Sequence, residues 1–277
     1  MQQSQHSKGR IDMLYRQLFI DAISDVLHDI QYRLVGNSFY IYKREIGVVI
    51  CIGFDVFMGG SNFIIYGGAE SVCSDIELLP NGKLPIGCYD VNVYAQRYRL
   101  PAFTNLNINP TDGAPKRYSK ALLVPKLQQN LMLLKERLLP DLLRIESMED
   151  YYNFKVRADG MMNAVAIPFP TIHTFYLCIF LGLIEPASHI YLRMHQRDDG
   201  NIAFINDHMK KDSRKKMIDV LECTQSRYIV LLESFEQYDT KAKAIETVLR
   251  ENQESLKVEA QKRIERSTNT LNHFFSE

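Results

Sequence analysis

Hydrophobic and polar positions change their spacing about halfway along the chain. Over residues 11–30, apolar side chains recur every three to four positions, which predicts an amphipathic helix. The segments 38–43, 48–57 and 63–66 instead carry apolar residues in alternation or in short unbroken runs, separated by glycine-containing turns. This pattern predicts strands that pair antiparallel in sequence order. A looser alternation over 89–98 predicts a fourth strand.

Helical spacing begins at residue 119. Leucines recur through 119–139 as far as Pro140, which lacks an amide hydrogen and is expected to end or kink this helix. The motif Ser147–Asp150 resembles a capping box and predicts a helix start. Further helices are predicted over 171–184, 187–196 and 213–237.

A loop separates the two patterns. Residues 105–115 are rich in Asn, Pro, Asp and Gly, which favour turns. We therefore predict an α+β sheet domain over 1–115 and a helical domain over 116–277. The expected fold class is α+β, with an N-terminal helix plus an antiparallel β-meander, followed by a helical C-terminal half with a long terminal helix.

The terminal segment, 239–275, contains no Gly or Pro and is predicted to be one continuous helix about 55 Å long. Its apolar residues follow a heptad-like, coiled-coil spacing up to Leu249, Asn252 falls at a core position, and later steps of four insert a stutter. The candidate partner seam comprises Ile245, Leu249, Leu256, Ile264 and Leu271. Such a seam could pack on its own domain, pair with 213–237, or meet a partner.

Composition narrows the class of protein. The 277 residues are 46% hydrophobic and 24% charged, with a formal net charge of zero, which argues against a uniformly cationic nucleic-acid binder. Five widely spaced cysteines without a C-x-x-C pair predict free thiols in a reducing cytosol. The most apolar stretch, 171–184, is shorter than the roughly 20 residues that span a bilayer. We therefore expect a cytoplasmic protein without a membrane segment.

Motifs that carry chemistry are missing from the sequence. There is no P-loop, no G-x-S-x-G and no H-E-x-x-H, so no catalytic residue, cofactor or metal ligand is predicted. A metal-dependent nuclease would use acids such as Asp55, Asp75 and Asp90 beside a [DE]-x-K motif. That motif occurs only at Asp239–Lys241, in the terminal helix.

One cluster of basic residues is the candidate patch for an anionic partner. Its members are Lys210, Lys211, Arg214, Lys215 and Lys216. Such a cluster could contact a phosphate backbone or an acidic protein, or it could be a solvated loop and first helical turn.

Short motifs in the first half carry a resemblance to a known group. They are Gly36–Tyr40, Lys43–Val49, the Leu-Leu-Pro at 138–140, and Ser147–Asp150. With these motifs, residues from Leu14 to about Asp150 resemble an uncharacterised bacterial domain-of-unknown-function family. The resemblance implies an α+β protein without known activity, whose genes sometimes lie near toxin, immunity or defence genes.

Together these observations favour a non-enzymatic protein-binding module, immunity-like or defence-associated, that meets a protein partner or self-associates through its C-terminal helix. A divergent metal-dependent nuclease or hydrolase is the first alternative. The second is a nucleic-acid-binding accessory protein that uses the Lys210–Lys216 cluster.

Overall fold

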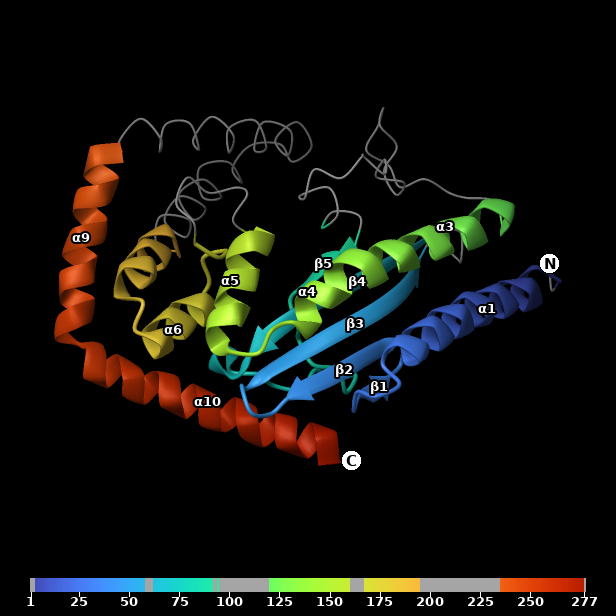
Figure 1. The fold of residues 1–277 in the computed structure, drawn as a ribbon, viewed down its shortest axis with the longest axis horizontal. Helices are drawn as coiled ribbons and strands as arrows, with labels where there is room; N and C mark the ends of the chain where they lie inside the picture. Colours follow the sequence, from blue (N-terminus) through green and yellow to red (C-terminus); the bar gives the residue numbers. More distant parts are fainter. Residues whose placement is uncertain are drawn as a thin grey trace, which may run out of the picture.

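The computed structural model confirms the α+β class. An N-terminal helix, α1 (Gln3–Val26), is followed by a five-stranded antiparallel sheet and then by helices that include a long C-terminal one (Figure 1). The structure describes residues 3–57, 62–91, 94, 120–159, 167–194 and 235–276. The predicted loop at 105–115, residues 213–234 of the predicted helix at 213–237, and the boundary at 115 lie outside these ranges, so the two-domain division stays a prediction.

The sheet is a meander with its strands in sequence order. The strands are β1 (Arg33–Val35), β2 (Ser38–Lys43), β3 (Val48–Phe57), β4 (Asn62–Ser71) and β5 (Cys88–Asp90). The predictions of β2 and β3 are confirmed. The predicted fourth strand is wrong at Val91 and Tyr94, where the backbone is helical, and the rest of 92–98 lies outside the described residues.

The third predicted strand ended too early. Gly67 and Gly68 were expected to form a turn, yet they pair with Ile52 and Cys51 inside the ladder. A side chain at Gly68 would meet the carbonyl oxygen of Gly87. Glycine therefore stands here because another backbone segment comes close, which is its second common use in strands.

One face of the sheet packs against α1. Phe19 stacks on Phe54 of β3 with ring centroids 5.3 Å apart. The buried stripe of α1 comprises Tyr15, Phe19, Ile23 and Leu27. Leu18 also fits the three-to-four spacing that predicted this helix, but it lies outside the buried stripe. Leu18 is 37% exposed. Apolar residues on both flanks of this helix satisfy the same period, so spacing alone does not choose the row that meets the sheet.

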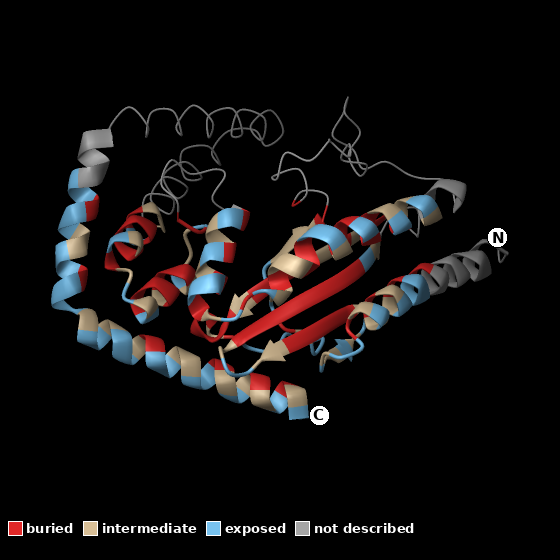
Figure 2. Ribbon diagram, in the orientation of Figure 1, coloured by how far each residue is buried: buried red, intermediate tan, exposed pale blue. Residues whose placement is uncertain are grey.

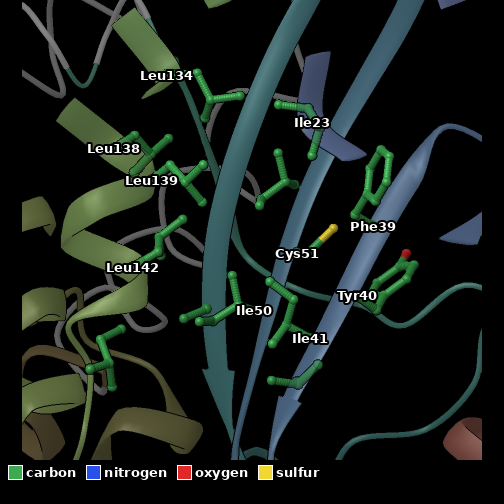
Figure 3. Packing of buried hydrophobic residues seen from close by; sticks show 14 of the residues in the cluster. Ile23, Phe39, Tyr40, Ile41, Ile50, Cys51, Leu134, Leu138, Leu139 and Leu142 are labelled. Atoms are coloured by element: carbon green, nitrogen blue, oxygen red, sulfur yellow. The ribbon is translucent and has the colours of Figure 1, made fainter. Parts of the chain in front are cut away.

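A second helical rod covers the same face. It consists of α3 (Lys120–Leu133), a π-helical turn (Leu134–Leu138) and α4 (Leu139–Leu143). Of the two predicted effects of Pro140, an end of the helix is wrong, because the rod continues to Leu143; the irregularity in the rod is the π-helical turn that precedes Pro140. The main-chain N–H of Leu139 donates to the carbonyl of Leu134, and Pro140 falls in the first turn of α4, where a missing N–H breaks no helical bond. Figure 3 shows Leu138 and Leu142 pointing from this rod toward the strands.

Three helices follow the rod, and the last two of them form a second, smaller core together with Leu249 and Ala260 of the C-terminal helices. The three helices are α5 (Met148–Asp159), α6 (Ile172–Leu181) and the helical residues 184–194. Both predicted starts are confirmed: the amide of Asp150 donates to the Ser147 hydroxyl at 3.0 Å, and Thr171 forms a capping box.

The terminal helix is two helices rather than one. α9 (Phe235–Glu251) and α10 (Gln253–Ser276) meet at Asn252 in the elbow visible in Figure 1. The side chain of Asn252 donates to the carbonyl of Val248 at 2.8 Å and so competes with the main chain for a helical acceptor. The predicted continuous helix over 239–275 is therefore wrong, although α10 confirms the long terminal helix.

α10 packs along its own sheet. Phe274 meets the ring of Tyr40 on the face opposite α1, with centroids 5.3 Å apart, and the Arg33 guanidinium lies 4.4 Å from the Phe274 centroid. The hydroxyl of Ser267 accepts a hydrogen bond from the amide of Ile76 at 2.7 Å, and Ser267 is fully buried. Buried residues recur along α10 between exposed ones (Figure 2). Apolar and polar contacts thus dock α10 intramolecularly.

Candidate protein-binding groove

A groove opens where four segments that are distant in sequence meet. The β2–β3 turn, the start of α5, the end of α6 and one side of α10 enclose a volume of about 700 Å³. We call this feature the α5–α10 groove. Its lining comprises Tyr42, Arg44, Glu45, Ile46, Gly47, Val72, Glu146, Ser147, Met148, Glu149, Phe180, Leu181, Gln261, Ile264, Thr268 and Asn272.

The floor of the groove is apolar. Val72 and Met148 are buried, while Ile264 is partly exposed. Gly47 has φ +67°, and a Cβ there would lie only 2.7 Å from a Val72 methyl, so the β2–β3 turn rests directly on the floor. At the edge, Phe180 leaves 43% of its surface exposed. The groove therefore offers an aromatic side chain above an apolar base.

The rim carries an excess of negative charge. Glu45, Glu146 and Glu149 are exposed, and within the described part of the chain none of the three forms a salt bridge. Among the described residues that line the groove, Arg44 is the one basic side chain. Its guanidinium lies 5.9 Å from the centroid of the Tyr42 ring.

The N-terminus of α5 does not reverse this balance. A free helix N-terminus attracts anions through its unpaired amides and the helix dipole. Here the Asp150 carboxylate accepts from the amide of Glu146 at 3.2 Å and from the Ser147 hydroxyl at 2.9 Å. The Asp150 carboxylate therefore adds a negative charge at this helix start, which opposes the attraction of an external anion.

A lysine below the rim is used by the fold. Lys43 Nζ donates to the carbonyls of Leu143 and Ile145 at 2.5 and 2.7 Å, at the end of α4. Burial lowers the pKa of Lys43, while Glu146 and Asp150 act in the opposite direction. Lys43 thus offsets part of the charge of two carboxylates while it ties β2 to the helical rod.

α10 adds polar groups to the groove. Gln261, Thr268 and Asn272 line it beside Ile264. The side-chain oxygen of Asn272 is buried and has no hydrogen-bond partner in the part of the chain that the structure describes. An amide oxygen in that state is an acceptor that a donor from a ligand could satisfy.

The predicted partner seam contacts the chain's own cores. Leu249 is buried in the second core, with Ile245 and Leu256 packed against it. Leu271 is fully buried beside the sheet, and Ile264 packs on the same cluster. Of these five residues, Ile264 also lines the groove. A partner role for the seam stays a prediction, and its side chains already have intramolecular contacts.

The remaining candidate residues are the basic cluster and the acids considered for a nuclease. The basic cluster of Lys210, Lys211, Arg214, Lys215 and Lys216 lies outside the described residues. Arg266 holds Asp75 in a bidentate pair at 2.7 and 2.8 Å, and this hydrogen bond lowers the pKa of Asp75. Asp55 is exposed on β3, and Asp90 lies on β5. In the described ranges, no three His, Cys, Asp or Glu side chains form a possible metal site.

The thiol prediction is confirmed where the structure can test it. The four described cysteines are Cys51, Cys73, Cys88 and Cys178, and all are free. Burial raises the pKa values of Cys73 and Cys178 to about 12, which keeps them protonated at neutral pH.

Comparisons with known proteins found no relative of this chain. Neither protein-family models, nor curated proteins, nor solved structures gave a match. Among the described helices, none combines the length and apolar composition needed to cross a bilayer.

Sequence reasoning missed the groove as a site. Its walls come from residues 42–47, 146–149, 180–181 and 261–272, and no spacing rule links such distant segments. The one local signal was the pair of glutamates around the Ser147 cap, which marks a helix start in any protein.

Proposed function

We propose that this chain is a non-enzymatic protein-binding module and that the α5–α10 groove is its partner surface. One observation carries the proposal: a groove of about 700 Å³ is lined by the exposed Phe180, by apolar floor residues and by polar rim residues. Protein interfaces have this arrangement of an apolar centre and a polar edge, and aromatic side chains often supply most of their binding energy.

The alternative functions receive less support from the described residues. The acids considered for a nuclease are separated, and Asp75 is engaged by Arg266. Among the hydroxyl groups that line the groove, that of Ser147 caps α5 and so is engaged in the fold. Phosphate backbones would be repelled by the glutamates of the rim, and the basic cluster at 210–216 lies outside the described ranges. An immunity-like or defence-associated role rests on the resemblance of the N-terminal half.

The proposal is tested by selecting random dodecapeptides from a display library on the full-length protein. Selected peptides are then measured against Phe180→Ala and against Val248→Ala, a control at an apolar position on α9 that is 56% exposed. Loss of an interface aromatic typically costs about 2 kcal/mol or more, which is roughly a 30-fold loss of affinity. We expect that loss for Phe180→Ala and no change for Val248→Ala.

The proposal is overturned if the selection yields no binder, or if the selected peptides bind Phe180→Ala as tightly as the unaltered protein. Circular dichroism of both variants checks that each retains the fold. Since both side chains are exposed in the structure, neither replacement opens a core cavity.

A further inference from the structure

We infer that the occupant of the α5–α10 groove is a cationic amphipathic peptide segment of another protein, with lysine or arginine beside a large apolar side chain. This inference rests on the proposed function and adds the chemistry of the partner. The chemistry follows from the charge of the rim, the apolar floor and the polar wall supplied by α10.

The rim selects positive charge. Glu45 enters from the β2–β3 turn, while Glu146 and Glu149 enter from the start of α5, so carboxylates lie on two separate walls. No salt bridge neutralises them within the ranges that the structure describes. Three like charges, of which Lys43 offsets only part at Glu146, favour a ligand cation that can approach more than one of them.

The groove also disfavours anions. At the start of α5 the amide of Asp150 already donates to the Ser147 hydroxyl, and the Asp150 carboxylate, which accepts from the amide of Glu146, adds a further negative charge. The single arginine of the lining, Arg44, is outnumbered by the three glutamates. An acidic or phosphorylated segment would therefore meet net repulsion.

The floor requires an apolar component in the ligand. Phe180 is exposed beside Leu181, Met148 and Ile264. A leucine-sized side chain or the alkyl part of a lysine can cover this surface, and a cationic group over an aromatic ring gains a further attraction. A purely hydrophilic cation would leave the floor in water.

The wall formed by α10 suits a peptide main chain. Asn272 offers a buried oxygen without a hydrogen-bond partner among the described residues, and Gln261 and Thr268 lie along the same helix. A volume of about 700 Å³ accommodates a few residues rather than a folded domain. An extended segment that brings its own N–H donors fits these conditions.

The test uses three labelled octapeptides of alternating sequence: leucine with lysine, leucine with glutamine, and leucine with glutamate. Fluorescence anisotropy with the full-length protein should show that the lysine peptide binds about tenfold more tightly than the glutamine peptide. The glutamate peptide should bind most weakly, and raising the salt concentration should reduce only the preference for lysine.

Two triple variants locate the charge effect. Changing Glu45, Glu146 and Glu149 to glutamine should remove the preference for lysine and leave binding of the glutamine peptide unchanged. The same change at Glu251, Glu254 and Glu259, which lie on α9 and α10 and do not line the groove, should leave the preference intact.

The outcomes separate the two proposals. Equal binding of all three peptides, with loss of all binding in Phe180→Ala, refutes the cationic partner and leaves the protein-binding groove standing. Tightest binding of the glutamate peptide likewise refutes the inference. If none of the three peptides binds, the cationic partner is refuted and the library selection alone decides the protein-binding groove. If the peptides bind and Phe180→Ala has no effect on any of them, the groove is not the partner surface and both proposals fail.

Discussion

Truncation of Phe274 should release the end of α10 from the sheet. Phe274 is 2% exposed and contacts the ring of Tyr40, the guanidinium of Arg33 and the ring of Phe275. Phe274→Ala removes these contacts and leaves a cavity against β2. Because the residue lies near the end of α10, the effect should be concentrated locally in this helix.

The magnitude follows from the burial of the side chain. Phenylalanine-to-alanine changes in cores cost about 3–5 kcal/mol. Undocking of the last turns relieves part of that loss, so we take about 3 kcal/mol for the local opening of residues 267–276, which is a factor of roughly 100 in the opening equilibrium. Global unfolding should lose less, since the sheet and α1 keep their own contacts.

Hydrogen exchange measured by mass spectrometry is the appropriate assay, because the chain has no tryptophan to report on the site. Peptides covering 267–276 should exchange about 100-fold faster in Phe274→Ala, and those covering β2 should be affected next. Asn269→Ala, an exposed change on the same helix, is the control and should alter exchange little. A change of less than about threefold in 267–276 for Phe274→Ala would refute intramolecular docking of α10.

Three further changes test the fold around the groove. Gly68→Ala should destabilise the protein by about 2 kcal/mol or more, because a Cβ there meets main-chain atoms. Gly67→Ala should destabilise it less, because a Cβ there meets leucine methyl groups at 3.1 and 3.2 Å, which can move. Urea unfolding of the two variants measures the difference. Lys43→Met should lower the free energy of unfolding by about 1–3 kcal/mol, since two carbonyls lose a charged donor, and an unchanged urea midpoint would contradict this. Arg266 lowers the pKa of Asp75 below its usual 3.8. The pair therefore stabilises the folded state at pH values above 3.8, and this stabilisation is lost as the pH falls through the lower pKa that Asp75 has in the folded state. Asp75→Asn should therefore be less stable than the unaltered protein at pH 7 and approach it near pH 2, and a constant difference would refute the assignment.

Local patterns predicted much of the sheet because its geometry is local. β2 and β3 follow from alternation and from the turn at Gly47, whose positive φ favours glycine. β4 was cut short because Gly67 and Gly68 resemble a turn in the sequence. Their reason is tertiary, since Gly68 faces the backbone at Gly87 and Gly67 faces Leu138. A single sequence does not show which backbone will come close.

The terminal helix shows the same limit. Its apolar spacing was identified correctly, but the same spacing serves a coiled coil, a helical hairpin or a helix on a sheet. In the structure the helix lies on the sheet. Ser267 binds Ile76, Arg266 binds Asp75, and Phe274 packs on Tyr40. Each of these partners is nearly 200 residues or more away in sequence, so local spacing could not reveal it. The groove could not be predicted from the sequence, because one of its walls forms only when α10 docks on the sheet.

That dependence couples docking of α10 to binding. Because α10 supplies Ile264 and Asn272 to the groove, a ligand that contacts this wall binds the docked state and must stabilise it. At a concentration 100 times its dissociation constant, such a ligand adds about 2.7 kcal/mol to docking, close to the loss expected for Phe274→Ala. A groove-binding peptide should therefore slow exchange of 267–276 in the unaltered protein and restore most of the protection in the variant, while its affinity for the variant falls. If a saturating peptide leaves the exchange rate of residues 267–276 unchanged, the ligand does not contact α10, and the partner surface lies on the α5 and α6 side alone.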